Sequence, residues 1–248
     1  MNLAPNPSSV VQYRPLDFSS FEWLTFDCYG TLIDWEAGIL RIIRLALPGI
    51  NASDADILRH YSEIEPAIQA KGYAKYREVL EEVTRQLARR YRMPITPTQA
   101  GMLAESIKNW QPFPDTVAGL KRLKSRFKLG IISNIDDDLF AGTAQWLEVE
   151  FDAVITAEQV GAYKPSKKNF EVALERTGVD RAKLLHCAES LYHDVAPTNE
   201  MGIANVWVNR RIGRSAEGAT LVPQDVKPWL MVPDIATLAA VALGDGKT

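Results

Sequence analysis

Polar and charged side chains follow several short apolar runs in this 248-residue sequence. Four such clusters occur in chain order: Asp27-Cys28-Tyr29-Gly30-Thr31, Ser133-Asn134, Tyr163-Lys164-Pro165, and Glu189-Ser190 together with Asp194. If the apolar runs are parallel strands, their carboxyl ends meet at one edge of a sheet, which is where open α/β sheets bind ligands. We therefore expect these side chains to converge on one site.

This set of residues can carry out covalent catalysis by a carboxylate. Asp27 would attack the substrate, and Lys164 would supply the positive charge that keeps the carboxylate ionised and oriented. An acid of the last cluster would orient Lys164 or a water molecule. The groups that would donate hydrogen bonds to the nucleophile or to a substrate anion are Thr31, Ser133 and Asn134.

Short apolar runs alternate with amphipathic stretches along most of the chain, which indicates a parallel α/β sheet. The expected strands are Phe21–Asp27, Leu129–Ser133, Ala153–Thr156, Leu184–Ala188 and Asn205–Val208. The expected helices around them are Pro114–Arg126, Asp137–Leu147, Lys167–Thr177, Asp194–Met201 and Asp234–Leu243. Ser166 is placed to cap the third of these helices. The fold class we expect is a Rossmann-like α/β core.

One long segment contains no strand-like run. Between Asp34 and Trp110 the pattern instead predicts four helices: Trp35–Leu47, Ala52–Ala70, Tyr73–Tyr91 and Thr96–Trp110. We therefore expect an all-helical cap over residues 35–111, inserted into a catalytic core made of residues 21–34 and 112–248. Residues 1–20, which are rich in proline and serine, are expected to form a flexible arm.

The composition is that of an ordinary globular protein, with 46% hydrophobic residues, 24% charged residues and a net charge of −3. No block of lysine and arginine occurs, so we expect no nucleic-acid partner. The sequence has neither the apolar stretch of a signal peptide nor a run of about 18 apolar residues, so we expect no membrane association. Cys28 and Cys187 lie in apolar runs and are expected to be reduced thiols of a cytoplasmic protein.

The four clusters resemble the four motifs of the haloacid dehalogenase superfamily, in order and each after a predicted strand. The matching segments are Phe26-Asp27-Cys28-Tyr29-Gly30-Thr31-Leu32, Ile132-Ser133-Asn134, Tyr163-Lys164-Pro165, and Ala188-Glu189-Ser190 through Asp194. A helical cap between the first two motifs is also the arrangement of one branch of this superfamily. The resemblance implies a hydrolase whose catalytic residues are Asp27, Lys164, Asp194 and Thr31.

Tyr29 bears on the type of reaction. Most phosphatases of the superfamily have a second Asp two positions after the nucleophile, which protonates the leaving alkoxide, and here that position is Tyr29. A halide needs no proton when it leaves, so Tyr29 favours cleavage of a carbon–halogen bond. The type II 2-haloacid dehalogenases, which this sequence resembles, have an aromatic residue there and a cap arginine that binds near the leaving halide and the substrate carboxylate. Arg59 falls near the place of that arginine, and it is expected to bind substrate together with Tyr29, Ser133 and Asn134.

Two departures from the family pattern leave alternatives open. Phe170 stands where the family usually has a tyrosine, and Glu189-Ser190-Leu191 replaces a Ser-x-Asn segment. Glu189 with Asp194 is closer to the acid pair of phosphatases, so a Mg²⁺-dependent phosphatase with the ligands Asp27, Glu189 and Asp194 is one alternative. The stretch from Glu189 to Asp194, with Lys108-Asn109-Trp110, is also similar to a branch that includes the azetidine-2-carboxylate hydrolases, which open a strained ring by the same aspartyl-ester logic. A non-catalytic binding protein is disfavoured, because it would need none of the catalytic set.

The sequence thus predicts a hydrolase that displaces a substituent at C2 of a short 2-substituted carboxylic acid through an ester on Asp27, with 2-haloacids as the favoured substrates. We expect neither a cofactor nor a metal, and we expect a small carboxylate as the binding partner. The sequence is also compatible with a homodimer. The histidines His60, His186 and His193 have no metal-ligand spacing, so packing or helix-end roles are expected for them.

Overall fold

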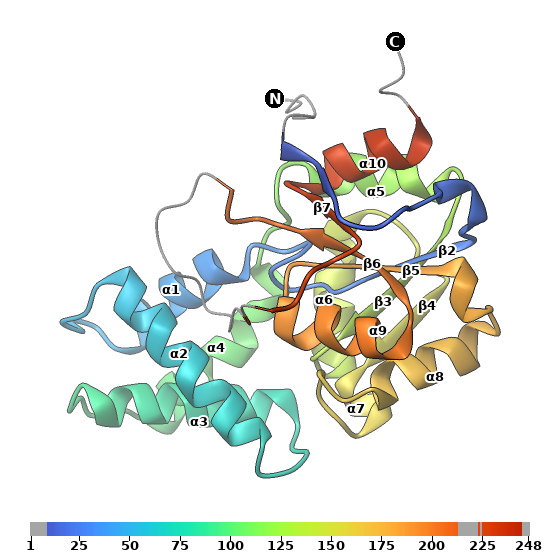
Figure 1. The fold of residues 1–248 in the computed structure, drawn as a ribbon. Helices are drawn as coiled ribbons and strands as arrows, with labels where there is room; N and C mark the ends of the chain where they lie inside the picture. The colour runs from blue at the N-terminus through green and yellow to red at the C-terminus, as the bar shows by residue number, and fades with distance from the viewer. Residues whose placement is uncertain (1–8, 213–222, 224, 245–248) are drawn as a thin grey trace.

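A seven-stranded sheet forms the centre of the computed structural model, which describes residues 9–212, 223 and 225–244. The strand order is β1-β7-β6-β5-β2-β3-β4, and the strands are parallel except for β1, which pairs antiparallel with β7 (Figure 1). Their bounds are β1 Val11–Gln12, β2 Trp23–Phe26, β3 Lys128–Ser133, β4 Ala153–Thr156, β5 Leu184–Ala188, β6 Ala204–Val208 and β7 Leu230–Val232. The expected α/β fold class is confirmed.

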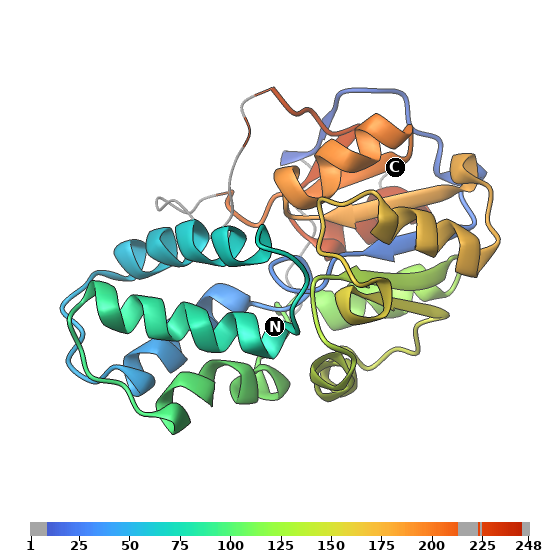
Figure 2. The ribbon, with the colours of Figure 1, turned by 90° about the horizontal axis from the view of Figure 1, so that it is seen from below.

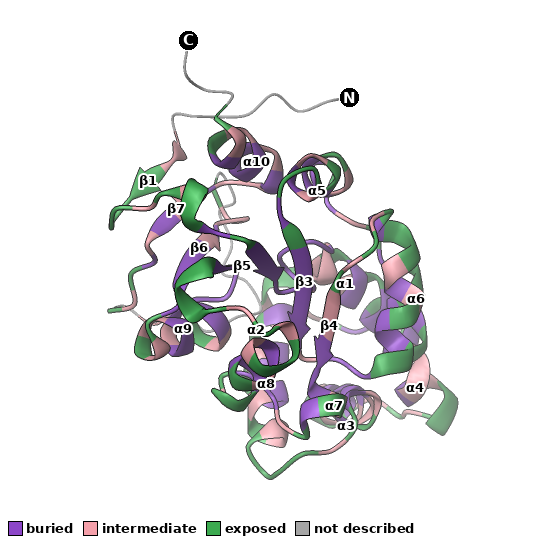
Figure 3. Cartoon of the chain, turned by 90° about the vertical axis from the view of Figure 1, so that its right-hand side faces the viewer, coloured by how far each residue is buried: buried purple, intermediate pink, exposed green. Residues whose placement is uncertain are grey.

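Helices cover both faces of this sheet, and this explains why its central strands are mostly apolar and almost entirely buried. In Figure 1, α5 (Thr116–Lys124) and α10 (Ile235–Leu243) lie above the sheet, and α8 (Lys168–Thr177) and α9 (Ala196–Met201) lie below it. Two further helices, α6 (Asp137–Leu147) and α7 (Ala157–Val160), follow β3 and β4. Figure 3 shows that the strands are largely buried, whereas the outer faces of the helices are exposed.

Four antiparallel helices form a separate cap beside the sheet (Figure 2). They are α1 (Trp35–Ala46), α2 (Asp54–Gln69), α3 (Tyr76–Arg90) and α4 (Pro97–Ser106), as the pattern predicts for this segment. Local sequence fixes where two of them begin: Ser53 accepts a hydrogen bond from the backbone N–H of Asp56, and Thr96 forms a capping box with Gln99.

The cap is joined to the core by two linkers and by contacts that include those of a buried carboxylate. Within the linkers, the backbone N–H of Asp34 donates to Gln111 O at 3.0 Å. Asp136, which follows β3 and is fully buried, accepts hydrogen bonds from the backbone N–H groups of Tyr76 (2.7 Å) and Arg77 (3.0 Å). These two groups begin α3, where the helix dipole favours a negative charge. The loop that carries Ser133 and Asn134 therefore also fixes the position of the cap.

Residues 1–8 of the arm expected over residues 1–20 lie outside the described residues, and in the described part Val11 and Gln12 pair with Met231 and Leu230 at the sheet edge. Two expectations about local structure were wrong. Ser166 does not cap α8, since Lys167 precedes that helix without a capping side chain. The expected helix Asp194–Met201 begins earlier, as a π-helical turn over Leu191–Val195. In the described part of the chain, no helix combines the length and apolar character needed to cross a membrane.

Candidate active site

Asp27 lies just beyond β2, at the edge where the carboxyl ends of the parallel strands meet. Its backbone N–H donates to Cys187 O at 3.1 Å, which continues the pairing of β2 with β5 and fixes the main chain. The residue is buried. Lys164 Nζ lies 2.8 Å from Asp27 Oδ1, and Thr31 Oγ1 lies 2.8 Å from Oδ2. Because each carboxylate oxygen can accept two hydrogen bonds, each keeps a lone pair for chemistry.

The Thr31 hydroxyl is oriented by the neighbouring strand end. The backbone N–H of Glu189 donates to Thr31 Oγ1 at 2.8 Å, so the hydroxyl proton is directed at Asp27 Oδ2. Between Asp27 and Thr31 the chain turns back sharply at Gly30, whose φ of +96° is rarely adopted by residues with a side chain. A Cβ there would also lie 3.0 Å from Trp35 Nε1. The local sequence thus aims a fixed donor at the Asp27 carboxylate.

Lys164 is 2% exposed and its ammonium group has three oxygen partners. Nζ donates to Asp27 Oδ1 (2.8 Å), Asp194 Oδ1 (2.6 Å) and Ile132 O (2.9 Å). Asn134 holds the main chain of this lysine: its Nδ2 donates to Lys164 O at 3.1 Å, and its Oδ1 accepts from Lys164 N at 2.7 Å. Asn134, expected to bind substrate, therefore uses its amide to position the lysine.

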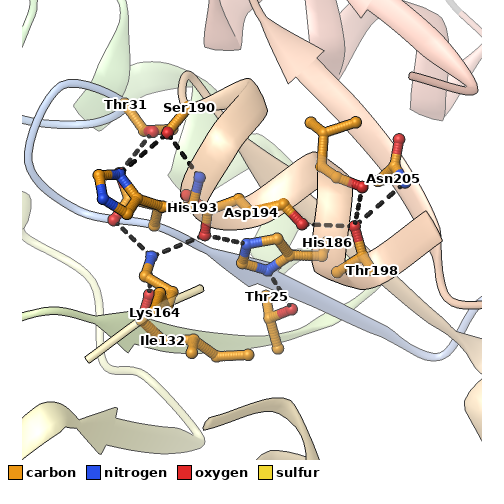
Figure 4. Close-up of polar contacts among 12 residues, drawn as sticks. Thr25, Thr31, Ile132, Lys164, His186, Ser190, His193, Asp194, Thr198 and Asn205 are labelled. Atoms are coloured by element: carbon orange, nitrogen blue, oxygen red, sulfur yellow. Dashed lines mark hydrogen bonds and ion pairs between the residues drawn. The ribbon is translucent and has the colours of Figure 1, made fainter. Parts of the chain in front are cut away.

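A buried hydrogen-bonded chain supports Asp194 from the other side (Figure 4). His186 Nε2 lies 2.9 Å from Asp194 Oδ1, and His186 Nδ1 lies 2.9 Å from Thr25 Oγ1. Because a carboxylate only accepts, Nε2 donates to Asp194 Oδ1, and Nδ1 shares a hydrogen bond with the Thr25 hydroxyl. His186, for which we expected a packing role, thus orients Asp194. Its position on β5 two residues before Ala188 places it beneath the site.

The two carboxylates that share Lys164 have opposite pKa shifts. Burial raises the pKa of Asp27, and the attraction of Lys164 only partly opposes this. Burial also acts to raise the pKa of Asp194, but Lys164 and His186 outweigh it and lower the value to about 2. Burial acts to lower the pKa of Lys164, and its two carboxylate partners raise it overall. The ammonium group therefore stays charged, Asp194 is its permanent counterion, and Asp27 is the more basic carboxylate.

A cavity of about 50 Å³ lies over Asp27, between the core and the cap. Its walls are formed by Asp27, Tyr29, Trp35, Glu65, Tyr76, Ser133, Asn134, Lys164, Glu189, Ser190, His193 and Asp194. Ser133 Oγ is buried and has no hydrogen-bond partner among the described residues, so it is free to bind a ligand. Tyr29 contributes its ring, because its hydroxyl is bound to Thr143 Oγ1 on α6 at 2.8 Å. The site thus places a buried carboxylate, a cation and a hydroxyl without a partner among the described residues in a small cavity.

Comparison with known proteins agrees with this geometry. A sequence profile of the haloacid dehalogenase-like hydrolase family matches residues 21–187, which is more than half of the chain. The chain belongs to this family. It is therefore a hydrolase, and the matched span contains Asp27, Ser133 and Lys164 in their motifs.

Several relatives within the haloacid dehalogenase-like family have named activities. An (S)-2-haloacid dehalogenase of Pseudomonas putida is 26% identical over 200 residues, which cover 77% of this chain and 86% of that protein. A haloacetate dehalogenase of Moraxella sp. is 25% identical over 195 residues, covering 76% and 86%. The fold matches the L-2-haloacid dehalogenase of Xanthobacter autotrophicus, solved with chloropropionic acid covalently bound, with a TM-score of 0.76 at 20% identity over 92% of this chain and all of that one.

Arg59, expected to face the site, does not reach it. Its side chain is 46% exposed and forms ion pairs with Asp56 (2.6 Å) and Glu63 (3.5 Å) on the outer face of α2. The prediction of a substrate-binding role for Arg59 is therefore wrong. The reason is helix geometry: the buried face of α2 carries Ile57, Tyr61 and Ile64, and Arg59 lies between these positions on the opposite side.

A carboxylate of the cap does line the cavity, and it was not predicted from the sequence. Glu65, also on α2, is 6% exposed and forms part of the cavity wall. His193 was assigned a packing role, yet its ring also borders the cavity and is held by Ser190 Oγ, 3.1 Å from Nδ1. Burial lowers the pKa of His193 to about 4, so the ring is neutral at pH 7. Trp35 and Tyr76 complete the cap wall.

The three ligands of the alternative Mg²⁺ site already have cationic partners. Asp27 and Asp194 share Lys164, and Glu189 Oε1 accepts a hydrogen bond from Arg211 Nε at 3.1 Å. No group of three or more metal-ligating side chains is arranged to hold an ion within the part of the chain that the structure describes. Lys164 and Arg211 thus already compensate the charges of these three carboxylates, which leaves less negative charge to hold a divalent cation.

Proposed function

We propose that this hydrolase displaces a substituent at C2 of a short 2-substituted carboxylic acid through an ester on Asp27, and that 2-haloacids are its substrates. The observation that carries the proposal is a buried Asp27 with its lysine and threonine partners, facing a small cavity with no acid two positions further on. The relatives named as haloacid dehalogenases support it.

In the first step, an oxygen of Asp27 attacks C2 from the side opposite the leaving group. The new C–O bond forms as the bond from C2 to the substituent breaks, and the substituent leaves with the electron pair. Asp27 loses its negative charge in this step, but Asp194 remains beside Lys164, so the buried ammonium is never without a counterion. The free Ser133 Oγ is placed to donate to the substrate carboxylate.

In the second step, water attacks the carboxyl carbon of Asp27 and the bond from this carbon to the substrate oxygen breaks. One water proton passes to the departing alkoxide, which leaves as the 2-hydroxy acid, and the other is released to solvent as the Asp27 carboxylate is restored. Asp194 is the carboxylate available to orient this water, because its Oδ1 holds Lys164 and His186 while its buried Oδ2 has no partner among the described residues. Thr31 and Lys164 remain hydrogen-bonded to the ester oxygens, and they stabilise the negative charge that develops there. No step requires a metal or a cofactor, so we propose that the reaction proceeds without either.

A second candidate differs only in the leaving group, which would be the amine of a strained ring. The position of Arg59 favours this candidate: its guanidinium lies on the outer face of α2 and cannot assist a departing halide. Among the described residues that line the cavity, Lys164 is the one with a permanent positive charge, and it is committed to two carboxylates.

Isotope labelling tests the shared mechanism. A single turnover in ¹⁸O-labelled water should place the label in the carboxyl group of Asp27, detected by mass spectrometry of its peptide, and Asp27→Asn should abolish turnover with the fold retained. Label found only in the first-turnover product would mean that water attacks the substrate directly. A panel of 2-chloropropionate enantiomers, fluoroacetate, azetidine-2-carboxylate and a phosphate ester, each with and without EDTA, then identifies the leaving group. Strict dependence on Mg²⁺ would contradict the proposal.

A further inference from the structure

Glu65 is a buried carboxylate in the cap wall of the catalytic cavity. Two tyrosine hydroxyls donate to the same oxygen, Oε1: Tyr76 at 2.7 Å and Tyr61 at 3.2 Å. These hydroxyls also lie 3.1 Å from each other, so the carboxylate is fixed by a small buried network. Its second oxygen, Oε2, has no hydrogen-bond partner among the described residues. A rigidly held acceptor is therefore available to whatever occupies the cavity.

The cavity wall carries more negative than positive charge. Its four carboxylates are Asp27, Glu65, Glu189 and Asp194, and its one permanent cation is Lys164. Lys164 serves Asp27 and Asp194, and Arg211 pairs with Glu189. Glu65 alone of the four has no cationic partner within the described residues. A substrate that carries only a carboxylate would add a further negative charge to this site, at a cost in a buried environment.

We propose that Glu65 binds an ammonium group of the substrate, so that the acid this chain acts on is a zwitterion with a positively charged amine. The inference rests on the proposed function, because it places C2 of the same substrate at Asp27. It goes further by assigning a specificity residue and a substrate class. The ammonium would neutralise Glu65 in the way that Lys164 neutralises Asp27, and its N–H groups would supply the donor that Oε2 lacks.

A neutral donor would satisfy this site less well than an ammonium. Burial raises the pKa of Glu65, which means that its surroundings disfavour the charged form of the carboxylate. A hydroxyl group would leave that penalty in place, whereas a cation removes it. The tyrosines cannot deliver the compensating charge, since burial raises the pKa values of Tyr61 and Tyr76 well above their usual range and both are neutral donors.

Binding of two product-like acids tests the inference without relying on turnover. The probes are 2-hydroxybutyrate and 4-amino-2-hydroxybutyrate, which differ by one amine, and affinity is measured by isothermal titration calorimetry on the full chain. We expect the wild type to bind 4-amino-2-hydroxybutyrate about 100-fold more tightly than 2-hydroxybutyrate, in line with the pairing of a buried charge. Glu65→Gln should reduce the preference to within about threefold. The matched control is Glu63→Gln, an exposed carboxylate two residues away on α2 whose loss should leave the preference unchanged.

A second variant separates recognition from folding. Tyr76→Phe removes the shorter hydrogen bond to Glu65 but keeps the carboxylate, so an intermediate preference is expected, with folding of each variant checked by thermal unfolding. Equal affinity of the wild type for the two acids, or a preference that survives Glu65→Gln, overturns the inference. If Asp27 is labelled by ¹⁸O with 2-chloropropionate while no amine preference exists, only the inference fails. If Asp27 is never labelled and neither acid binds, the proposed function fails as well.

Discussion

Replacing Lys164 with methionine should uncouple the two buried carboxylates that it holds together. Asp27 Oδ1 and Asp194 Oδ1 lie 2.8 and 2.6 Å from the same Nζ, so these two oxygens are no more than about 5.4 Å apart. Without the lysine, two unit charges at about 5 Å repel each other by about 3 kcal/mol at an effective dielectric constant of about 20. Removal of one partner of a buried ion pair typically costs about 3–5 kcal/mol, so we expect a loss of this size in the free energy of unfolding at pH 7.5.

The loss should depend on pH in a defined direction. In Lys164→Met one of the two carboxylates must bind a proton to relieve the repulsion, so its folded-state pKa rises above the unfolded value of about 3.9. The folded protein then holds more protons than the unfolded chain near neutral pH, and its stability falls as the pH rises. We expect the deficit relative to wild type to be largest at pH 7.5 and smaller at pH 5, measured by urea unfolding. Turnover should fall by at least about 1,000-fold, because Asp27 is then protonated or misplaced.

Lys167→Met is the matched control for this prediction. Lys167 lies three residues further along and forms an exposed ion pair with Glu200 at 2.8 Å. Exposed pairs contribute about 0–1 kcal/mol, so this variant should unfold and turn over almost like the wild type. If Lys164→Met were as stable as Lys167→Met at pH 7.5, the argument that one ammonium compensates two buried charges would be refuted.

Two further predictions concern residues whose roles the structure revised. Arg59→Ala should change kcat/KM by less than about twofold and stability by less than about 1 kcal/mol, because an exposed ion pair on α2 is lost; a tenfold loss of activity would place the guanidinium in the site after all. In the folded protein the pKa of His193 is lowered to about 4, from an ordinary value of about 6.5. Between these two pH values the unfolded chain binds a proton that the folded protein does not bind. Stability should therefore fall by up to about 2 kcal/mol from about pH 6.5 to about pH 5, and His193→Gln should lack this part of the fall in urea unfolding.

The core and the place of the candidate site could be predicted because their sequence signals are local. Strands buried on both faces are short apolar runs, and two of the candidate site residues mark the ends of such runs: Asp27 follows β2 and Ser133 ends β3. Parallel pairing then brings distant groups together without further information. The edge strand β1 was missed for the opposite reason: two exposed residues, Val11 and Gln12, pair with β7 but carry no apolar pattern.

Hydrogen-bond partners within the site could not be predicted from spacing. Asn134 lines the cavity, but the spacing did not show that its amide also forms two hydrogen bonds with the main chain of Lys164. His186 lies on a strand two residues before the fourth motif, and only the geometry of the sheet shows that it links Asp194 to Thr25. A buried polar group forms a hydrogen bond with a donor or acceptor that lies nearby, and packing decides which group that is.

The cap shows how a residue type can mislead when its helical phase is ignored. Arg59 was expected to face the site because it falls near the place of the cap arginine of the type II 2-haloacid dehalogenases. The apolar stripe of α2, however, runs through Ile57, Tyr61 and Ile64, and Arg59 falls outside it. Glu65 continues that stripe, four residues after Tyr61, so the phase alone places a carboxylate on the buried face. A charged side chain at a stripe position is costly to bury unless something pairs with it, and here the described partners are two neutral tyrosines. Glu65 lines the cavity over Asp27, and its Oε2 has no hydrogen-bond partner among the described residues. If Glu65 binds an ammonium group as we propose, the cap selects its ligand by negative charge, where the family resemblance led us to expect a positive one.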